Sequence, residues 1–438
     1  MPEYFHIEGQ GRKMVLRGEI LVSGAKNAAL KAFPASLLFT DGLTVTNVPE
    51  IEDVRTTASL ASLFGIPIER RLEGAYSLGP RKGKGTKLDR ELSKKIRASI
   101  MMTGPILARY GAVTFYFPGG CLIGKRPIDQ YLRSFTAMGA KVKETEIDGT
   151  IEITVTAPKR GLKGATLFLR MPSVGVTETL MMAAVLSRGV TTIKNAAMEP
   201  EIIALADYLH LCGASIEGAG TPTIKIEGGE LLQSKGRPYI TIPDRIEAGS
   251  FVILAALIGK DVTIGNCEPA HLDALLHELK ECGVRFEVGK DFVRVRESKK
   301  TYTLGGRSLA LKTHEYPGFP TDLQAPMLAF LTQVEGDSSV FETIFESRLE
   351  YVADINKMGG SIVPVAQNQV VIHGPTPLVG REMKAMDLRS GMAFLILGLM
   401  SKGESRVENA YNIDRGYAHI EDRLRAIGAR IERVYEKD

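Results

Sequence analysis

The sequence HLCGASIE, at residues 210–217, joins the apolar end of an amphipathic helix to a short strand. Gly213 stands between the two. Glycine directly after the last helical turn is a helix stop signal, because it adopts the left-handed backbone conformation without steric cost. The stretch therefore predicts a helix–glycine–strand unit.

The same unit recurs six times along the 438 residues of the chain, with its glycines at Gly65, Gly139, Gly213, Gly283, Gly359 and Gly428. The spacings between these glycines are 74, 74, 70, 76 and 69 residues. Unrelated helix–strand units would not keep so even a spacing, so we interpret the copies as an internal repeat. A period of about 70 residues is longer than that of common solenoids. We therefore expect two pseudo-symmetric domains of three repeats each.

A second, more apolar helix precedes each copy, predicted at residues 27–39, 95–110, 176–188, 247–258, 322–334 and 388–402. Each of these helices is predicted to stop near a glycine: Gly42, Gly111, Gly189, Gly259, Gly336 or Gly403. A helix that is apolar nearly all round must be enclosed by other elements. Each repeat thus reads as strand, buried helix, strand, amphipathic helix, strand.

The composition is that of an ordinary globular protein, with 44% hydrophobic residues, 24% charged residues and a net charge of +4. So small a charge gives no reason to expect nucleic acid or a membrane surface as a partner. The longest apolar runs, 251–259 and 392–400, are much shorter than a membrane span. The first residues lack the apolar region of a signal peptide. We therefore expect a soluble, cytoplasmic protein.

The cysteines and histidines show no metal-binding pattern. None of Cys121, Cys212, Cys267 and Cys282 lies in a CxxC pair, and the seven histidines lack ligand spacing. We expect neither a metal nor a disulfide framework. Cys212 and Cys282 follow apolar helix ends and are interpreted as core residues.

The loop PGGCLIGKR, at residues 118–126, nearly matches a phosphate-binding Walker A loop. The Ser or Thr that would bind magnesium is replaced by Arg126, so we exclude an ATPase. The loop carries the thiol of Cys121 close to Lys125 and Arg126, and nearby cations make a thiol more reactive. Two interpretations stay open: a functional thiol, or a small residue in a tight loop.

Three further segments carry charged residues at helix starts. Lys26 and Asn27 open the first apolar helix, where they would suit either a bound anion or solvent. Thr321 or Asp322 would either cap the fifth apolar helix or supply a general base. Arginines also recur near repeat junctions, and several converging arginines would suit a substrate with many negative charges.

Ten segments in this order resemble the UDP-N-acetylglucosamine enolpyruvyl transferases over essentially the whole chain. They are SGAKNAAL (23–30), IRASI (96–100), PGGCLIGKRPID (118–129), PSVG (172–175), NAAMEPEI (195–202), PDRIEAG (243–249), FPTDLQA (319–325), FESR (345–348), DLRS (387–390) and IDRGY (413–417). The resemblance implies an α/β fold of two inverse α/β barrel domains, each of three βαβαββ repeats, as in EPSP synthase. The first domain would span residues 26–242 and the second 1–25 plus 243–438, with the active site in the interdomain cleft.

The resemblance also implies roles for individual residues. Cys121 matches the family cysteine that protonates phosphoenolpyruvate, forms a covalent pyruvate adduct and is alkylated by fosfomycin. Asp322 matches the residue proposed to deprotonate the sugar hydroxyl, and Lys26 and Arg415 complete the catalytic set. The phosphoenolpyruvate contacts would be Lys26, Asn27, Arg126 and Arg415. The UDP-sugar contacts would be Arg97, Arg126, Pro127, Ile128, Asp129, Gln130, Ser173, Val174, Gly175, Asp322 and Ile344.

The implied reaction transfers the enolpyruvyl group of phosphoenolpyruvate to the 3-hydroxyl of UDP-N-acetylglucosamine and releases phosphate. It is the first committed step of peptidoglycan synthesis, and so serves cell wall biogenesis, cell shape and cell division. The resemblance implies no cofactor and no metal, only small-molecule partners, and a monomer or weak homo-oligomer. The chain departs from some family members at Met171, where they carry a lysine, and at Gln130, where they carry an apolar residue.

Two alternatives to this function stay open. The first is another enolpyruvyl acceptor, such as shikimate 3-phosphate, although the cysteine-bearing loop favours the UDP-sugar. The second is a non-catalytic paralogue that only binds the nucleotide sugar. The presence of Cys121, Asp322, Lys26 and Arg415 together argues against a paralogue without activity.

Overall fold

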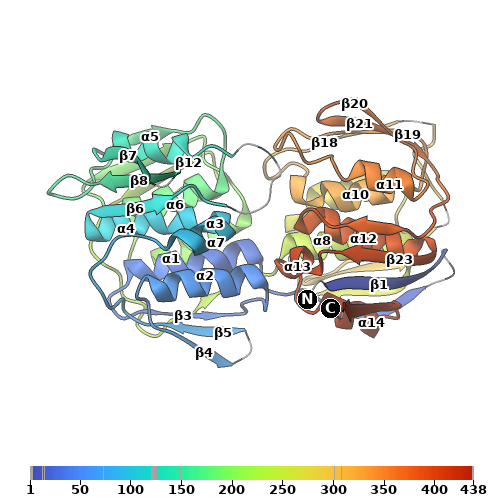
Figure 1. The fold of residues 1–438 in the computed structure, drawn as a ribbon, viewed down its shortest axis with the longest axis horizontal. Helices are drawn as coiled ribbons and strands as arrows, with labels where there is room; N and C mark the ends of the chain where they lie inside the picture. Colours follow the sequence, from blue (N-terminus) through green and yellow to red (C-terminus); the bar gives the residue numbers. More distant parts are fainter. Residues whose placement is uncertain are drawn as a thin grey trace. The chain divides into compact units, whose positions relative to one another are not determined.

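The computed structural model describes residues 3–11, 13, 15–72, 74–119, 124, 126–147, 149–299, 301–306 and 308–436. The chain divides into two compact units (Figure 1). The described residues of the middle unit lie within 24–119 and 126–242, and those of the terminal unit lie within 3–23 and 243–436, together with Gly124.

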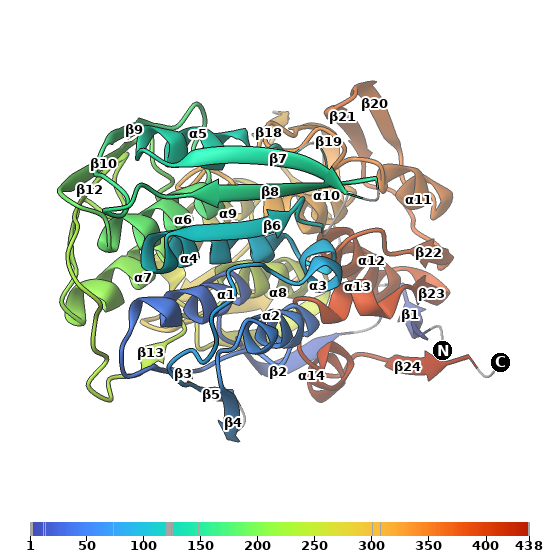
Figure 2. The ribbon, with the colours of Figure 1, turned by 60° about the vertical axis from the view of Figure 1, so that its left-hand side comes forward.

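The described residues of the middle unit form three sheets. In spatial order, the first contains β13 (Tyr239–Ile240), β3 (Leu43–Thr46), β5 (Ala75–Leu78) and β4 (Ile68–Leu72). The second contains β6 (Ala112–Tyr116), β8 (Thr150–Thr156) and β7 (Lys141–Ile147), which lie side by side in Figure 2. The third contains β11 (Ser215–Glu217), β12 (Thr223–Glu227), β10 (Val190–Lys194) and β9 (Thr166–Phe168). The unit closes on itself, because its last strand, β13, pairs in parallel with its first, β3.

Three buried helical segments form the centre of the middle unit. They are α1 (Lys26–Ala35) with η1 (Ser36–Leu38), η2 (Arg97–Met102) with α4 (Thr103–Tyr110), and α6 (Val174–Val185). Helix α6 contacts α4, and η2 contacts both α1 and α6. The other helices are α2 (Glu52–Leu63), α3 (Arg90–Lys95), α5 (Asp129–Ala137) and α7 (Pro200–Leu211). The apolar helices are enclosed as their composition requires.

The terminal unit has three sheets of the same kind among its described residues. In spatial order, the first contains β22 (Glu382–Lys384), β23 (Lys402–Glu408), β1 (Glu3–Gln10) and β24 (Ile431–Tyr435). The second contains β15 (Phe286–Val288), β16 (Phe292–Glu297), β14 (Gly259–Gly265) and β2 (Leu16–Leu21). The third contains β17 (Tyr302–Thr303), β19 (Val334–Phe341), β21 (Gln369–Gly374) and β20 (Ile362–Ala366), and β18 (Leu309–Lys312) also pairs with β19. Strand β1 pairs antiparallel with β23, with Phe5 opposite Val407, and antiparallel with β24. The N-terminal strand therefore completes the sheet of the sixth repeat.

The centre of the terminal unit consists of α8 (Arg245–Ile258), α10 (Gln324–Leu331) and α12 (Leu388–Met400), which contact one another. The other helical segments are η3 (Pro269–Leu272), α9 (Asp273–Glu281), η4 (Thr321–Leu323), α11 (Val352–Lys357), α13 (Ala410–Asp414) and α14 (Ile420–Ala426). Every residue of α8 and α12 is buried. In the part of the chain that the structure describes, none of the helices combines the length and the apolar character needed to cross a membrane.

The six repeat glycines all adopt the left-handed conformation, with φ between 81° and 110°. This confirms the stop signal that the sequence predicts after each amphipathic helix. All six buried helices stop at or before the predicted glycine, and five of these glycines have a positive φ. Gly259, the C-cap of α8, differs only in its backbone conformation, with φ −96°. Helix α8 there passes directly into β14, and the positive φ falls instead on Asp261, where the pairing with β2 is irregular.

The predicted bounds of four buried helices need correction, and the third of them runs from Val174 to Val185 rather than over 176–188. The first and fifth consist of an α-helix joined to a 3-10 turn, η1 or η4, and the fifth ends at Leu331 rather than 334. The second does not begin at residue 95, because Ile96 is extended and separates α3 from η2. Apolar composition alone does not reveal such local breaks.

Candidate active site

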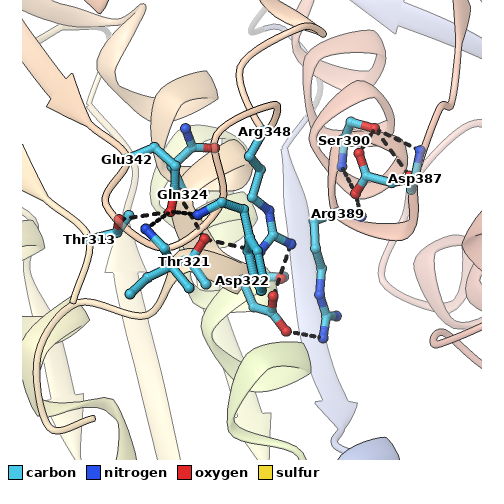
Figure 3. A network of polar contacts seen from close by, with 12 residues as sticks. Thr313, Thr321, Asp322, Gln324, Glu342, Arg348, Asp387, Arg389 and Ser390 are labelled. Carbon is cyan, nitrogen blue, oxygen red and sulfur yellow. Dashed lines mark hydrogen bonds and ion pairs between the residues drawn. The ribbon is translucent and has the colours of Figure 1, made fainter. Parts of the chain in front are cut away.

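Asp322 lies in η4, at the start of the fifth buried helix, and faces two arginines (Figure 3). Its Oδ1 is 2.9 Å from Nη2 of Arg348, and its Oδ2 is 2.7 Å from Nη2 of Arg389. The N-cap of η4 is Pro320, and no side chain caps this segment. Asp322 is thus held by ion pairs with Arg348 and Arg389, and its side chain does not cap the helix.

The surroundings of Asp322 favour its ionised form. Burial by itself opposes ionisation, but the charges of Arg389 and Arg348 and their hydrogen bonds outweigh burial and hold the pKa of Asp322 well below its ordinary range. The Asp322 side chain keeps 26% of its surface exposed, against 4% for Arg348 and 7% for Arg389. The carboxylate is therefore a permanent hydrogen-bond acceptor with one accessible side.

Arg348 and Arg389 are functional candidates to which the sequence analysis gave no role. Arg389 is the second residue of α12, whose N-cap Asp387 accepts hydrogen bonds from the backbone N–H groups of Arg389 and Ser390. Arg348 follows β19 in the segment FESR. Both arginines lie within matched motifs, and that position was the one available signal. Their common partner, Asp322, is distant in the sequence.

Two further predicted site residues belong to the terminal unit. Arg415 is the C-cap of α13 and is 8% exposed, and α13 packs against the helix that carries Arg389. The backbone N–H of Ile344 donates to Oε1 of Glu342 at 2.9 Å. Oε2 of the same carboxylate accepts from Thr321, the neighbour of Asp322, at 2.8 Å. One buried carboxylate therefore binds both Ile344 and the residue next to Asp322.

In the middle unit, Lys26 opens α1 and forms an ion pair with Asp53, in the first turn of α2. The Lys26 Nζ and Asp53 Oδ2 atoms are 2.7 Å apart, and the side chains are 13% and 6% exposed. Lys26 is therefore not a solvated lysine, because the carboxylate of Asp53 holds its ammonium group. Asn27 is the next residue of the same helix.

Arg97 and Arg126 are brought together directly. Nη2 of Arg97, at the start of η2, donates to the backbone carbonyl of Arg126. Burial, with a smaller contribution from the Arg126 charge, lowers the pKa of the Arg97 guanidinium. Ile128 is the N-cap of α5, so Pro127 lies just before the helix. The structure thus joins Arg97 to the start of α5.

The starts of α5 and α6 also lie together. Oε1 of Gln130 in α5 accepts from the backbone N–H of Arg170 at 2.9 Å, just ahead of the α6 N-cap, Ser173. A Cβ atom on Gly175 would lie 2.6 Å from the hydroxyl oxygen of Tyr131. The structure thus brings Asp129 and Gln130 close to Ser173, Val174 and Gly175. Met171, the departure from some relatives, is 46% exposed in this region.

Cys121 and Lys125 lie outside the described residues. The three described cysteines are free thiols, and Cys267 and Cys282 are buried as core residues, whereas Cys212 is only partly buried. The prediction that Cys212 is a core residue is therefore correct only in part. Among the described side chains, no three His, Cys, Asp or Glu residues form a group suited to a metal ion.

Comparison with known proteins places this arrangement in a family. Residues 11–424 match the family model described as EPSP synthase (3-phosphoshikimate 1-carboxyvinyltransferase). The chain is 42% identical to UDP-N-acetylglucosamine 1-carboxyvinyltransferase 1 of Caldanaerobacter subterraneus subsp. tengcongensis, covering 95% of this chain and 97% of the relative. It is 40% identical to the UDP-N-acetylglucosamine 1-carboxyvinyltransferase of Trichlorobacter lovleyi, covering 97% and 98%.

Solved structures share the fold. The enolpyruvyl transferase NikO from Streptomyces tendae superposes with a TM-score of 0.86 at 21% identity, covering 99% of each chain. The EPSP synthase from Acinetobacter baumannii superposes with a TM-score of 0.73 at 17% identity, covering 99% of this chain and 100% of that one. The predicted fold class is confirmed. The chain belongs to the EPSP synthase family.

Proposed function

We propose that this protein transfers the enolpyruvyl group of phosphoenolpyruvate to the 3-hydroxyl of UDP-N-acetylglucosamine and releases phosphate. The observation that carries the proposal is 42% identity, over 95% of the chain, to a relative named for this UDP-sugar reaction. The EPSP synthase family model also covers residues 11–424, which supports enolpyruvyl transfer as the reaction class. In the cell the product would enter peptidoglycan synthesis.

The chemistry needs an acid, acceptors for two protons (that of the sugar hydroxyl and one from the methyl group) and several cations. Protonation of the phosphoenolpyruvate methylene carbon makes the neighbouring carbon oxocarbenium-like, and the sugar hydroxyl oxygen bonds to that carbon. The tetrahedral adduct then loses phosphate, and the new methyl group loses a proton, which restores the double bond. We assign the first proton to Cys121 and the cationic contacts to Lys26, Asn27, Arg126 and Arg415.

The low pKa of Asp322 is compatible with a role as proton acceptor. Before attack, its carboxylate would accept a hydrogen bond from the sugar hydroxyl and orient the oxygen. Once the carbon–oxygen bond forms, the proton sits on a positively charged ether oxygen and is strongly acidic. A weak base is then sufficient, and Arg348 and Arg389 keep the base ionised.

The remaining predicted contacts would bind the nucleotide sugar. Arg97, Arg126 and the starts of α5 and α6 supply guanidinium and backbone N–H groups, which suit a diphosphate. Met171 brings no donor to this region. Arg170 is its neighbour in the sequence. The backbone N–H of Arg170 donates to Gln130, and this hydrogen bond would hold the segment around Met171, where some relatives have a lysine.

The proposal extends to the setting of the enzyme. We place the protein in the cytoplasm, as a monomer or weak homo-oligomer with small-molecule partners alone. Its described cysteines are free thiols, as is usual in a reducing compartment.

The test is phosphate release by the purified protein from phosphoenolpyruvate, with UDP-N-acetylglucosamine or shikimate 3-phosphate as acceptor. Release with the UDP-sugar alone supports the proposal. Release with shikimate 3-phosphate alone would keep the chemistry but reassign the acceptor. No release with either acceptor, together with binding of the UDP-sugar in calorimetry, would indicate a binding-only paralogue.

A further inference from the structure

Glu342 is a buried carboxylate behind the candidate proton acceptor, only 1% exposed, and the roles assigned above do not include it. It follows β19 directly and accepts four hydrogen bonds (Figure 3). Oε1 accepts from Oγ1 of Thr313 at 3.0 Å and from the backbone N–H groups of Ile344 at 2.9 Å and Phe345 at 3.2 Å. Oε2 accepts from Oγ1 of Thr321 at 2.8 Å. An ionised carboxylate offers about four acceptor positions, so the number of donors matches its capacity, with three of them at Oε1 and one at Oε2.

The hydrogen bond between Glu342 and Thr321 has a fixed direction. A carboxylate only accepts, so the Thr321 hydroxyl proton points at Glu342. The lone pairs of the same hydroxyl then face Arg348, whose Nη1 donates to Oγ1 at 3.0 Å. Nη2 of Arg348 meets Oδ1 of Asp322 at 2.9 Å. Two adjacent residues, Thr321 and Asp322, therefore both bind the guanidinium of Arg348, and Glu342 orients the hydroxyl of Thr321.

We propose that Glu342 is the positioning residue of the acceptor-sugar site. Through Thr321 it holds Arg348 against Asp322, and through two backbone N–H groups it holds the turn that carries Ile344. One buried carboxylate thus fixes the position of the proton acceptor, Asp322, relative to the segment that would contact the sugar. The inference rests on the proposed function for its kinetic consequence, whereas its structural consequence stands without that function.

The primary variant is Glu342→Gln, which keeps the shape but replaces one acceptor oxygen by an NH₂ group. At Thr321 this group donates, so the hydroxyl proton loses its acceptor and the orientation toward Arg348 is no longer imposed. Displacement of reacting groups by about 1 Å costs on the order of 100-fold in rate. We expect kcat to fall about 10- to 100-fold and the KM for the UDP-sugar to rise, with the KM for phosphoenolpyruvate nearly unchanged.

A matched pair keeps the test informative if Glu342→Gln does not fold. Thr321→Val and Thr313→Val each remove one hydroxyl that donates to Glu342, but Thr321 alone also contacts Arg348. Thr321→Val should reproduce the kinetic loss, and Thr321→Ser should restore most of the activity. Thr313→Val should lose stability, because it also leaves the backbone N–H of Thr343 without its acceptor, yet keep kcat and both KM values within about threefold.

Crystal structures of the two valine variants make the test independent of activity. We expect Nη2 of Arg348 to leave hydrogen-bond distance of Asp322 in Thr321→Val and to remain there in Thr313→Val. If Arg348 stays in place in both, or if both variants show equal kinetics, Glu342 is not a positioning residue. If the wild-type protein releases no phosphate with either acceptor, the proposed function fails, and the two structures still decide the role of Glu342.

Discussion

Asp322 and Arg389 lie 67 positions apart in the sequence, and their Oδ2 and Nη2 atoms are 2.7 Å apart in the folded chain. Each belongs to the start of a buried helical segment, η4 for Asp322 and α12 for Arg389, and α10, which follows η4, packs against α12. The contact puts a charged pair at the ends of two apolar helices, where helix packing fixes its geometry. A carboxylate bound in this way stays ionised and aligned without help from solvent.

Asp322→Asn removes the charge that two nearly buried arginines share. Leaving buried charges without a partner costs about 3–5 kcal/mol, so we expect a loss of this size in the free energy of unfolding measured with urea. If Asp322 accepts the hydroxyl proton, kcat should also fall at least about 100-fold. Asp337→Asn is the matched control, because Asp337 pairs with His373 at the surface and its loss should cost less than about 1 kcal/mol. Equal losses of unfolding free energy in the two variants would show that Asp322 does not hold Arg348 and Arg389 as assigned.

The contribution of Asp322 to stability should have a defined pH range. Its pKa in the folded protein lies below the ordinary value of 3.8, so the contribution is present above 3.8 and is lost as the pH falls through the folded value. The difference in unfolding free energy between wild type and Asp322→Asn should therefore be flat from pH 5 to 8. It should shrink only in more acidic solution. A difference that changes between pH 5 and 8 would show that the carboxylate is not held in the ionised form.

The buried pair of Lys31 and Glu178 predicts the opposite pH dependence. Lys31 Nζ lies 2.8 Å from Glu178 Oε2, and burial, opposed by the charge of Lys31, raises the pKa of Glu178 to about 7. A raised pKa stabilises the fold below the unfolded value of 4.5, and this contribution is lost as the pH rises through about 7. Wild-type stability should therefore carry a component that declines between these values, and this component should be absent in Glu178→Leu.

A double-mutant cycle tests the same pair. Lys31→Met alone leaves a buried carboxylate unpaired and should cost about 3–5 kcal/mol at pH 8. Adding Glu178→Leu removes that charge, and most of the stability should return, because replacing both members of a buried pair by apolar residues is often neutral. Additive losses in the cycle would show that the two charges are not coupled.

The thiols should differ sharply in reactivity toward an alkylating reagent at neutral pH. Burial raises the pKa of Cys267 to about 11 and that of Cys282 to about 12, so both should react only after unfolding. Cys212 is partly buried and its pKa is also raised, first of all by burial, so it should react slowly. Cys121 should react first and carry the fosfomycin adduct in a peptide mass spectrum. Rapid alkylation of Cys121→Ser at any other cysteine would contradict this order.

Cys121→Ser also tests the assigned acid. We expect turnover to be nearly abolished while the thermal unfolding midpoint stays within a few degrees of wild type. Full activity in the serine variant would remove Cys121 from the proton-transfer step.

Gly175 is predicted to be required because of one close contact. Gly175→Ala would place a Cβ atom 2.6 Å from the hydroxyl oxygen of Tyr131, a buried ring that is 5% exposed. We expect the start of α6 to shift and the KM for the UDP-sugar to rise about tenfold or more. Adding Tyr131→Phe leaves Cζ as the nearest ring atom, 3.9 Å from the new methyl group, an ordinary contact distance. The double variant should regain sugar binding, whereas an unrelieved defect would show that Gly175 acts through something other than this contact.

Much of the fold was predictable because the signals are local. Each repeat glycine needs only its own helix end to adopt the left-handed conformation, and all six do so. The apolar helices were recognisable from composition for the same reason. The prediction failed at Ile96, whose extended backbone separates α3 from η2 within a segment that the sequence predicts as one helix.

The candidate site was less accessible to sequence reasoning. Motif resemblance named Asp322, Lys26 and Arg415, but not the groups that hold them. Lys26 pairs with Asp53 of the next helix, and Asp322 with arginines from two later segments. Such pairings depend on which helices pack together, and nothing in the spacing of the residues reveals it.

By itself, the sequence determined the six-fold repeat, the alternation of buried and amphipathic helices, and the family to which the ten motifs belong. The repeat and the helix alternation follow from backbone conformation and from apolar periodicity, which act over a few residues, whereas the family follows from the resemblance of the motifs. Only the tertiary structure decided that β1 completes the sheet of the sixth repeat, that two arginines share Asp322 and that Glu342 lies behind them. The reason is physical: hydrogen bonds and ion pairs act over a few ångströms in space, and folding alone brings residues hundreds of positions apart within that range.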